Sequence, residues 1–194
     1  MKRTVKTLVC ITGALLLNLS LFAQLKLPLN NALTQDLKKV VADYPNQFEH
    51  LKGELIAENP QSTEYQCNLK VNGAETSHIT RYSSKKNVCS WEALMLSTES
   101  FEKARQKYRS LFQQLNNLSA DIGEESNIRF KGAYEAPAEE KKFSSVLFET
   151  EPGRKLKLEL VMQFHEPMEW KVKILLYDRE REDEERGATR ENSL

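Results

Sequence analysis

Outside its first 23 residues the chain carries few side chains suited to nucleophilic or metal chemistry: Cys67, Cys89, His50, His78 and His165. A cysteine beside a histidine could form a catalytic pair, because the imidazole can accept the thiol proton. Cys67 or Cys89 could meet His78 in this way, since they fall on strands expected to be neighbours. The histidines show no metal-ligand spacing, and no HExxH or CxxC motif is present. We therefore assign no catalytic residue, no metal ligand and no cofactor.

The two cysteines have a second possible role as a disulfide, which an oxidising compartment would permit. They fall on the second and fourth strands of an expected meander, and two strand spacings amount to about 9.6 Å. That separation exceeds the Cα reach of a disulfide. We favour two core cysteines, and a Cys67–Cys89 bridge is the alternative if the strand order differs.

Five residues form the candidate binding set: Lys155, Lys157, Lys171, Trp91 and Trp170. The lysines alternate with apolar residues, as expected for the wet face of a sheet. Both tryptophans alternate with small or aliphatic residues, which favours a place in the core. If they point outward instead, they are paired aromatic anchors of the kind that dominate protein interfaces.

The elements that position these residues show clear periodicity, above all in residues 155–177. Apolar residues recur there at every second position on both sides of the turn at residues 165–167. Period two predicts a β-hairpin with one buried face. Earlier segments predict two helices at 33–44 and 101–118, four strands at 48–56, 65–71, 75–82 and 88–96, and two strands at 128–136 and 143–150.

Local signals mark some of the ends of these elements. Asn72-Gly73 favours a tight hairpin turn, because both residues tolerate positive φ. Thr98 is a candidate N-cap of the second helix. Asp121-Ile122-Gly123 is expected to end that helix.

Helix, four strands, helix, four strands is an order that suggests an internal repeat. Lys52-Gly53 and Trp91 recur 79 positions later as Lys131-Gly132 and Trp170. The sequence therefore predicts an α+β fold of two helix-plus-four-stranded antiparallel meander units, residues 24–97 and 98–177. We expect them to form one sheet with helices on one face, each helix covering its own meander.

The N-terminus resembles an export signal. Basic residues Lys2, Arg3 and Lys6 precede an apolar run that ends at Phe22, and Ala23 follows. This is the layout of a cleavable signal peptide of residues 1–23. We expect an exported protein, periplasmic or secreted, with no membrane span once the signal is removed; an uncleaved anchor is the alternative.

Charge argues against nucleic-acid binding. The chain has 28 basic and 28 acidic residues, and removal of the three basic residues of the signal leaves a net charge of −3. A nucleic-acid site needs clustered Lys and Arg. The charged tail, residues 178–194, has almost no apolar residues and is expected to be disordered.

In element order, residues 33–177 resemble the β-lactamase inhibitor protein family, whose fold is a tandem repeat of helical segments each followed by a four-stranded sheet. The resemblance involves no shared motif, so it implies a fold and no binding residues. The segments LFQQLNNLS, KGAYEAPAEEKKFSSVLF and MEWKVKILLYDRERED are similar to small exported proteins of Bacteroidetes-type bacteria with no assigned function. That similarity implies a bacterial exported protein and no activity.

Three functions remain compatible with these features. Our leading hypothesis is a non-enzymatic binding or envelope-interaction protein that uses the uncovered face of the sheet to contact a protein in the cell envelope or a secreted one. The alternatives are a carrier of a small apolar ligand between helices and sheet, and a hydrolase of unrecognised type.

Overall fold

The computed structural model describes residues 32–83, 88–122 and 125–178. The predicted signal peptide and the predicted tail, apart from Asp178, lie outside these ranges. The helices are α2 (Ala32–Asp43) and α3 (Phe101–Leu115), with short 3-10 helices η1 (Tyr44–Asn46), η2 (Glu49–Leu51) and η3 (Glu139–Lys141). The strands are β1 (Lys52–Asn59), β2 (Ser62–Cys67), β3 (Thr76–Tyr82), β4 (Cys89–Thr98), β5 (Ser119–Ile122), β6 (Glu125–Lys131), β7 (Phe143–Glu151), β8 (Leu156–His165) and β9 (Glu169–Asp178).

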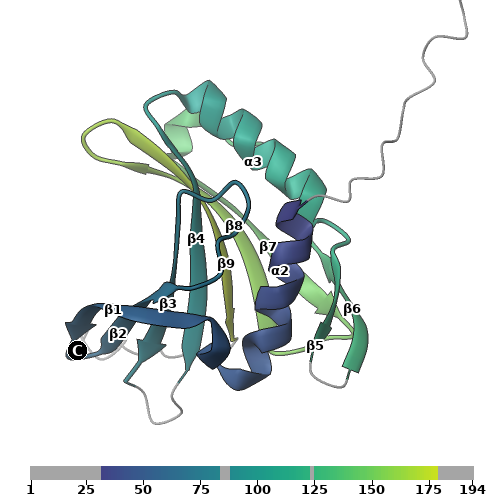
Figure 1. Cartoon of the computed structure of the whole chain (residues 1–194). Coiled ribbons are helices and arrows are strands. Elements are labelled where there is room, and N and C mark those ends of the chain that lie inside the picture. The colour runs from purple at the N-terminus through teal and green to yellow at the C-terminus, as the bar shows by residue number, and fades with distance from the viewer. Residues whose placement is uncertain (1–31, 84–87, 123–124, 179–194) are drawn as a thin grey trace, which may run out of the picture.

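These strands form one nine-stranded sheet in the order β1-β2-β3-β4-β9-β8-β7-β6-β5, and every neighbouring pair is antiparallel. Two meanders, β1–β4 and β5–β9, therefore meet along the β4–β9 pair (Figure 1). The predicted α+β class, the single antiparallel sheet and the β8–β9 hairpin are confirmed. None of the helices in the described part of the chain is long and apolar enough to cross a membrane.

The second meander has five strands where the sequence predicts four. The additional strand is β5, in a stretch where the sequence predicts only the end of the preceding helix. α3 ends at Leu115, and Asn117, with φ of 68°, reverses the chain. Leu118 and Ala120 are buried after that reversal. Four residues are too few to show a period, so β5 gave no signal.

The turns of the first meander also differ from prediction. β1 and β2 join through a tight turn at Pro60-Gln61, because Asn59 pairs with Ser62. Asn72-Gly73 lies instead in a longer link between β2 and β3, where Gly73 has φ of 77°. Gly73 has the predicted positive φ, and β2 and β3 form the predicted antiparallel pair. The predicted tight turn is wrong, because residues 68–75 connect the two strands.

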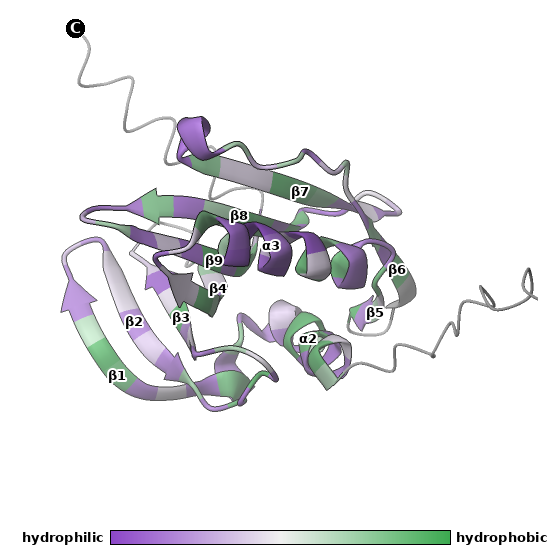
Figure 2. Ribbon diagram, turned by 90° about the horizontal axis from the view of Figure 1, so that it is seen from above, coloured by the Kyte–Doolittle hydropathy of each residue, from purple (hydrophilic) through white to green (hydrophobic). Residues whose placement is uncertain are grey.

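Both helices lie on the same face of the sheet (Figures 1 and 2). α3 packs across β4, β9 and β8 at the centre, whereas α2 packs alongside β5 of the second meander. The expectation that each helix covers its own meander is therefore wrong for α2. Helix pairing of this kind depends on long-range packing, which local periodicity does not report.

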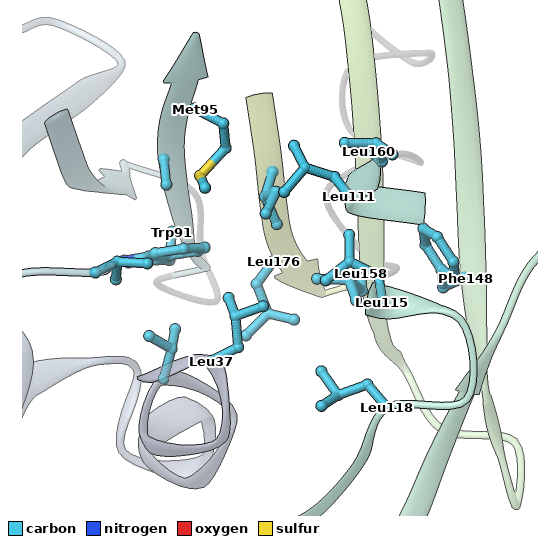
Figure 3. Close-up of a cluster of buried hydrophobic side chains, with 14 of the residues drawn as sticks. Leu37, Trp91, Met95, Leu111, Leu115, Leu118, Phe148, Leu158, Leu160 and Leu176 are labelled. Carbon is cyan, nitrogen blue, oxygen red and sulfur yellow. The ribbon is translucent and has the colours of Figure 1, made fainter. Parts of the chain in front are cut away.

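The core lies between the helices and this face of the sheet. Leu111 and Leu115 of α3 point toward Leu158 and Phe148, and Leu37 of α2 lies near Leu176 (Figure 3). All six side chains are at most 1% exposed. Burial of a leucine or phenylalanine side chain contributes roughly 1.5–3 kcal/mol, so this layer is the main source of stability.

α3 begins at Phe101 as predicted, but its N-cap lies two residues after the predicted Thr98. The Ser100 hydroxyl accepts a hydrogen bond from the Lys103 backbone N–H at 3.3 Å and is the N-cap. The Thr98 hydroxyl accepts from the Ser100 N–H at 3.2 Å, so it supports the cap without being the cap itself. Glu102 lies in the first turn, where a negative charge favours the helix dipole.

The edge strand β1 extends beyond the reach of either helix. Leu55 shares a row with Tyr65, Ile79 and Trp91, so it faces the helix side. It is nevertheless 57% exposed, and the neighbouring Ile56 is 56% exposed. Figure 2 shows this hydrophobic stretch along β1.

Close packing between β6 and β7 generates the first prediction. A Cβ at Gly132 would lie 2.7 Å from Val146 Cγ1 and 2.9 Å from Phe148 Cδ1, and both side chains are buried. We expect Gly132→Ala to lower the free energy of unfolding by about 1–3 kcal/mol, measured by urea denaturation. Gly153→Ala is the matched control, because nothing lies within 4 Å of its Cβ position. Equal stabilities of the two variants would contradict the packing described here.

Candidate functional site

The candidate surface is the face of the sheet opposite the two helices, which we call the open face. Strand alternation assigns residues to it: where Trp91, Ile174 and Leu158 point to the helices, their chain neighbours point away. Two adjacent rows cross β4, β9, β8 and β7 on this face, namely Glu92, Leu175, Glu159 and Leu147, and then Leu94, Lys173, Val161 and Ser145.

These two rows form a checkerboard of aliphatic and polar side chains. Leu175, for example, has Glu92 and Glu159 across the strands and Lys173 along its own strand. Leu94, Leu147 and Val161 are surrounded by polar neighbours in the same way. Leu94, Leu147 and Leu175 are half-buried, and Val161 is 8% exposed. No two aliphatic side chains are direct cross-strand partners in these rows. The face thus has enough apolar surface to be buried by a partner, and enough polar groups to stay in contact with water in the free protein.

The charges on this face are already engaged with one another. Lys173 Nζ lies 2.7 Å from Glu92 Oε1 across the β4–β9 pair. The Tyr177 hydroxyl donates to Glu159 Oε2 at 3.0 Å. His78 Nε2 lies 3.9 Å from the same Glu92 oxygen. A partner that covers these rows therefore meets few charges that lose their counter-ions.

A second polar cluster lies at the far end of the β4–β9 pair. The Ser97 hydroxyl donates to Glu169, and Lys171 Nζ lies 3.1 Å from the same carboxylate. These two contacts, the Ser97 hydrogen bond first, lower the pKa of Glu169. Glu169 is therefore a carboxylate at neutral pH and holds Lys171 along its own strand.

The three predicted lysines have different environments. Lys155 is exposed just before β8. The Lys171 side chain is 30% exposed and paired with Glu169. Lys157 differs, because its side chain is only 7% exposed and its ammonium lies 2.7 Å from Glu149. Lys157 therefore acts as a structural cation at the edge of the open face.

Both predicted tryptophans lie in the core between helices and sheet. Trp91 is 0% exposed and lies beside Leu176 and Leu37 (Figure 3). Trp170 is 4% exposed and packs edge-to-face against Phe101 and Phe164 at 5.2 and 5.3 Å. The placement agrees with the core interpretation, and neither indole reaches the open face.

The structure separates the cysteines from each other and from His78. β3 lies between the strands of Cys67 and Cys89, and the register places them at opposite ends of β3. Two strand spacings and about four residues amount to roughly 16 Å, too far for a disulfide. Alternation puts both thiols on the helix side and His78 on the open face. The conceivable cysteine–histidine pair is therefore ruled out.

The remaining candidate chemistry is also local and structural. His50 Nδ1 lies 2.6 Å from Asp43 Oδ1, next to the end of α2. Burial raises the pKa of the Cys89 thiol. The pKa of Tyr108 is also raised, mainly by burial and to a smaller extent by the nearby Tyr134 hydroxyl. Within residues 32–83, 88–122 and 125–178, no three Asp, Glu, His or Cys side chains are placed to hold a metal ion.

Sequence reasoning missed the aliphatic half of the open face. Its signal was the uninterrupted run Ile174-Leu175-Leu176, in which strict alternation fails. Consecutive apolar residues in a strand place apolar groups on both faces. Leu147 in Val146-Leu147-Phe148 is a second example of the same signal.

Comparisons with protein-family models, curated proteins and solved structures found no match to this chain. The predicted resemblances to the β-lactamase inhibitor protein family and to small exported bacterial proteins therefore stay predictions, as does the internal repeat. The function has to be argued from the geometry of the surface itself.

The burial of Lys157 generates a stability prediction. Lys157→Glu places a carboxylate at a position that is only 7% exposed, next to Glu149, whose side chain is 71% exposed. We therefore expect a loss of about 1–3 kcal/mol in urea denaturation. Lys171→Glu changes a more exposed ion pair and should cost less than about 1 kcal/mol. If the two reversals destabilise equally, Lys157 is not the structural cation described here.

The cysteine geometry predicts the redox state and reactivity of the thiols. When a chain starting at Gln24 is denatured without reductant, two thiols per chain should react with a thiol reagent. In the native Cys67→Ser variant, the rate of Cys89 alkylation by iodoacetamide should still rise above pH 9. The raised pKa leaves less thiolate, the reactive form, at neutral pH. Loss of both thiols under non-reducing conditions, or a rate plateau below pH 8, would contradict this.

Proposed function

We propose that the protein is an exported, non-enzymatic binding protein that holds another protein against the open face of its sheet. The observation that carries this proposal is the checkerboard of Leu94, Leu147, Val161 and Leu175 among paired charges. Protein interfaces combine an apolar centre with polar groups in this way. The described helices leave this face uncovered.

The dimensions of the face support a protein as the partner. Five strands from β3 to β7 span about 24 Å at 4.8 Å each, and ten residues of β8 span about 34 Å. The resulting area of roughly 800 Å² equals what one partner contributes to an interface of standard size. A small ligand would use a fraction of it.

The charge arrangement supports reversible binding. Removal of water from an unpaired charge is expensive, whereas Glu92, Lys173 and Glu159 keep their partners within the protein. The aliphatic side chains between them supply contact area without requiring complementary charges. Such a face suits a partner surface that is itself mixed in polarity.

Export assigns the compartment of the partner. The basic and apolar start of the chain supports secretion through a signal peptide of residues 1–23. The partner is then a protein of the cell envelope or a secreted one. The proposal involves no nucleic acid, no cofactor and no catalysed reaction.

Site-specific photo-crosslinking in the native host tests this proposal. Gln163 lies on the open face beside Lys171 and Phe143, and it is exposed. A benzoylphenylalanine at Gln163 should crosslink one dominant protein of the envelope or medium. The same residue at Gln106, exposed on the outer side of α3, is the matched control. Leu175→Glu should reduce the crosslink at least fivefold.

Two outcomes would contradict the proposal. One is a protein captured equally from Gln163 and Gln106, because such capture would not depend on the open face. The other is the absence of any crosslinked protein from Gln163 when the variant is folded and exported. Urea denaturation of purified Leu175→Glu separates loss of binding from loss of folding.

A further inference from the structure

A hollow of about 500 Å³ lies on the helix side of the protein, between α3 and the extended segment after β6. Six side chains supply its chemistry: Arg105, Gln106, Arg109, Phe112, Gln113 and Tyr134. The volume is within the range of small-molecule sites. The hollow is on the side of the sheet opposite the open face, so it is independent of the function proposed above.

Helix geometry explains why these groups converge. Arg105, Arg109 and Gln113 follow one another at intervals of four residues and therefore share one outer stripe of α3. Phe112 lies beside that stripe and turns toward the sheet, where it stacks on Phe148 at 5.7 Å. Its ring is thus fixed from below.

Tyr134 forms the opposite wall. Its ring centroid lies 4.9 Å from that of Phe112 and 6.2 Å from that of Tyr108. Tyr108 is fully buried. Tyr134 is 38% exposed although it packs against both rings. The two accessible aromatic rings are therefore anchored in the core and leave ring surface open to the hollow.

The hollow is positively charged at the position where a ligand would bind. Both charged side chains that line it are guanidinium groups. Arg105 shares its charge with Glu102 at 2.7 Å, whereas Arg109 forms no hydrogen bond or ion pair with the described residues. The carboxylate next to Tyr134, that of Glu135, is held by Lys141 at 2.6 Å. An anion entering the hollow meets an available guanidinium.

The complete set of groups specifies a class of ligand. Guanidinium groups bind carboxylates through paired N–H donors, and the amide NH₂ groups of Gln106 and Gln113 are further donors. The aromatic rings favour a flat apolar body. The side-chain acceptors for ligand hydroxyl groups are two amide carbonyls and one phenol, so a sugar acid fits less well.

We propose that this hollow is a binding site for a small aromatic carboxylate. The carboxylate group pairs with Arg109, with Arg105 as the second guanidinium. The ring lies against Phe112 and Tyr134. The glutamine amides complete the hydrogen bonds to the carboxylate oxygens.

The site is tested by titrating the mature chain with 2-naphthoate and measuring binding by calorimetry and by ¹H–¹⁵N NMR. We expect saturable binding, with shifts confined to residues 105–113 and 132–136. The neutral isostere 2-naphthamide should bind at least tenfold more weakly, as should 2-naphthoate to Arg109→Gln. Tenfold corresponds to about 1.4 kcal/mol, close to the lower limit of what one charge-assisted hydrogen bond contributes. D-glucuronate should also bind more weakly than 2-naphthoate.

Lys103→Gln is the matched control, because Lys103 is exposed on the same helix and does not line the hollow. It removes one positive charge of α3, and affinity should stay within twofold. An equal loss in Lys103→Gln and Arg109→Gln would overturn the proposal, since attraction to the helix as a whole would explain both. Equal affinity for the amide, tighter binding of glucuronate, or shifts elsewhere would also overturn it.

Discussion

The antiparallel pairing of β4 with β9 is the constraint on which the rest of the structure depends. It joins two meanders that otherwise share no strand pairing, and it places Trp91 opposite Leu176 and Ala93 opposite Ile174. These side chains are buried under α3, which packs across both strands. A sheet of nine strands is thereby covered along its central seam. Covering the seam stabilises both halves at once, which a helix over each separate meander would not do.

The same arrangement determines which surfaces stay uncovered. Two helices concentrated over the centre and β5 cannot reach β1, so Leu55 is exposed although it faces their side. They also leave the whole open face without a helical layer. The central strands must be apolar toward the helices at every second residue, so only the intervening positions were available to vary. At those positions Glu92, Lys173 and Glu159 alternate with aliphatic residues. This alternation runs across neighbouring strands, so it cannot be seen in the sequence of one strand alone.

Prediction from sequence succeeded where the pattern was long and local. The ten-residue strands β8 and β9, with apolar residues at every second position, were correctly identified, and so was the amphipathic stripe of α3. It failed for β5, which is too short to show a period. It also failed for the packing of α2, which depends on contacts between residues about 80 positions apart. The lysines illustrate the limit for the candidate site: Lys155, Lys157 and Lys171 look alike in sequence. The Lys157 side chain is nevertheless only 7% exposed, whereas that of Lys171 is 30% exposed.

The two proposed sites use the same physical principle in opposite ways. On the open face, the charged groups already have ion-pair or hydrogen-bond partners within the protein, so a large and mixed partner surface can cover them at a lower desolvation cost. In the hollow on α3, Arg109 is left without a partner among the described residues, while rings anchored in the core bound the space around it. An available charge beside fixed apolar walls selects a small anion, because only a small ligand can pair with the guanidinium and contact both rings. The availability of the charges, more than their number, therefore distinguishes a protein-binding face from a ligand-binding one in this molecule.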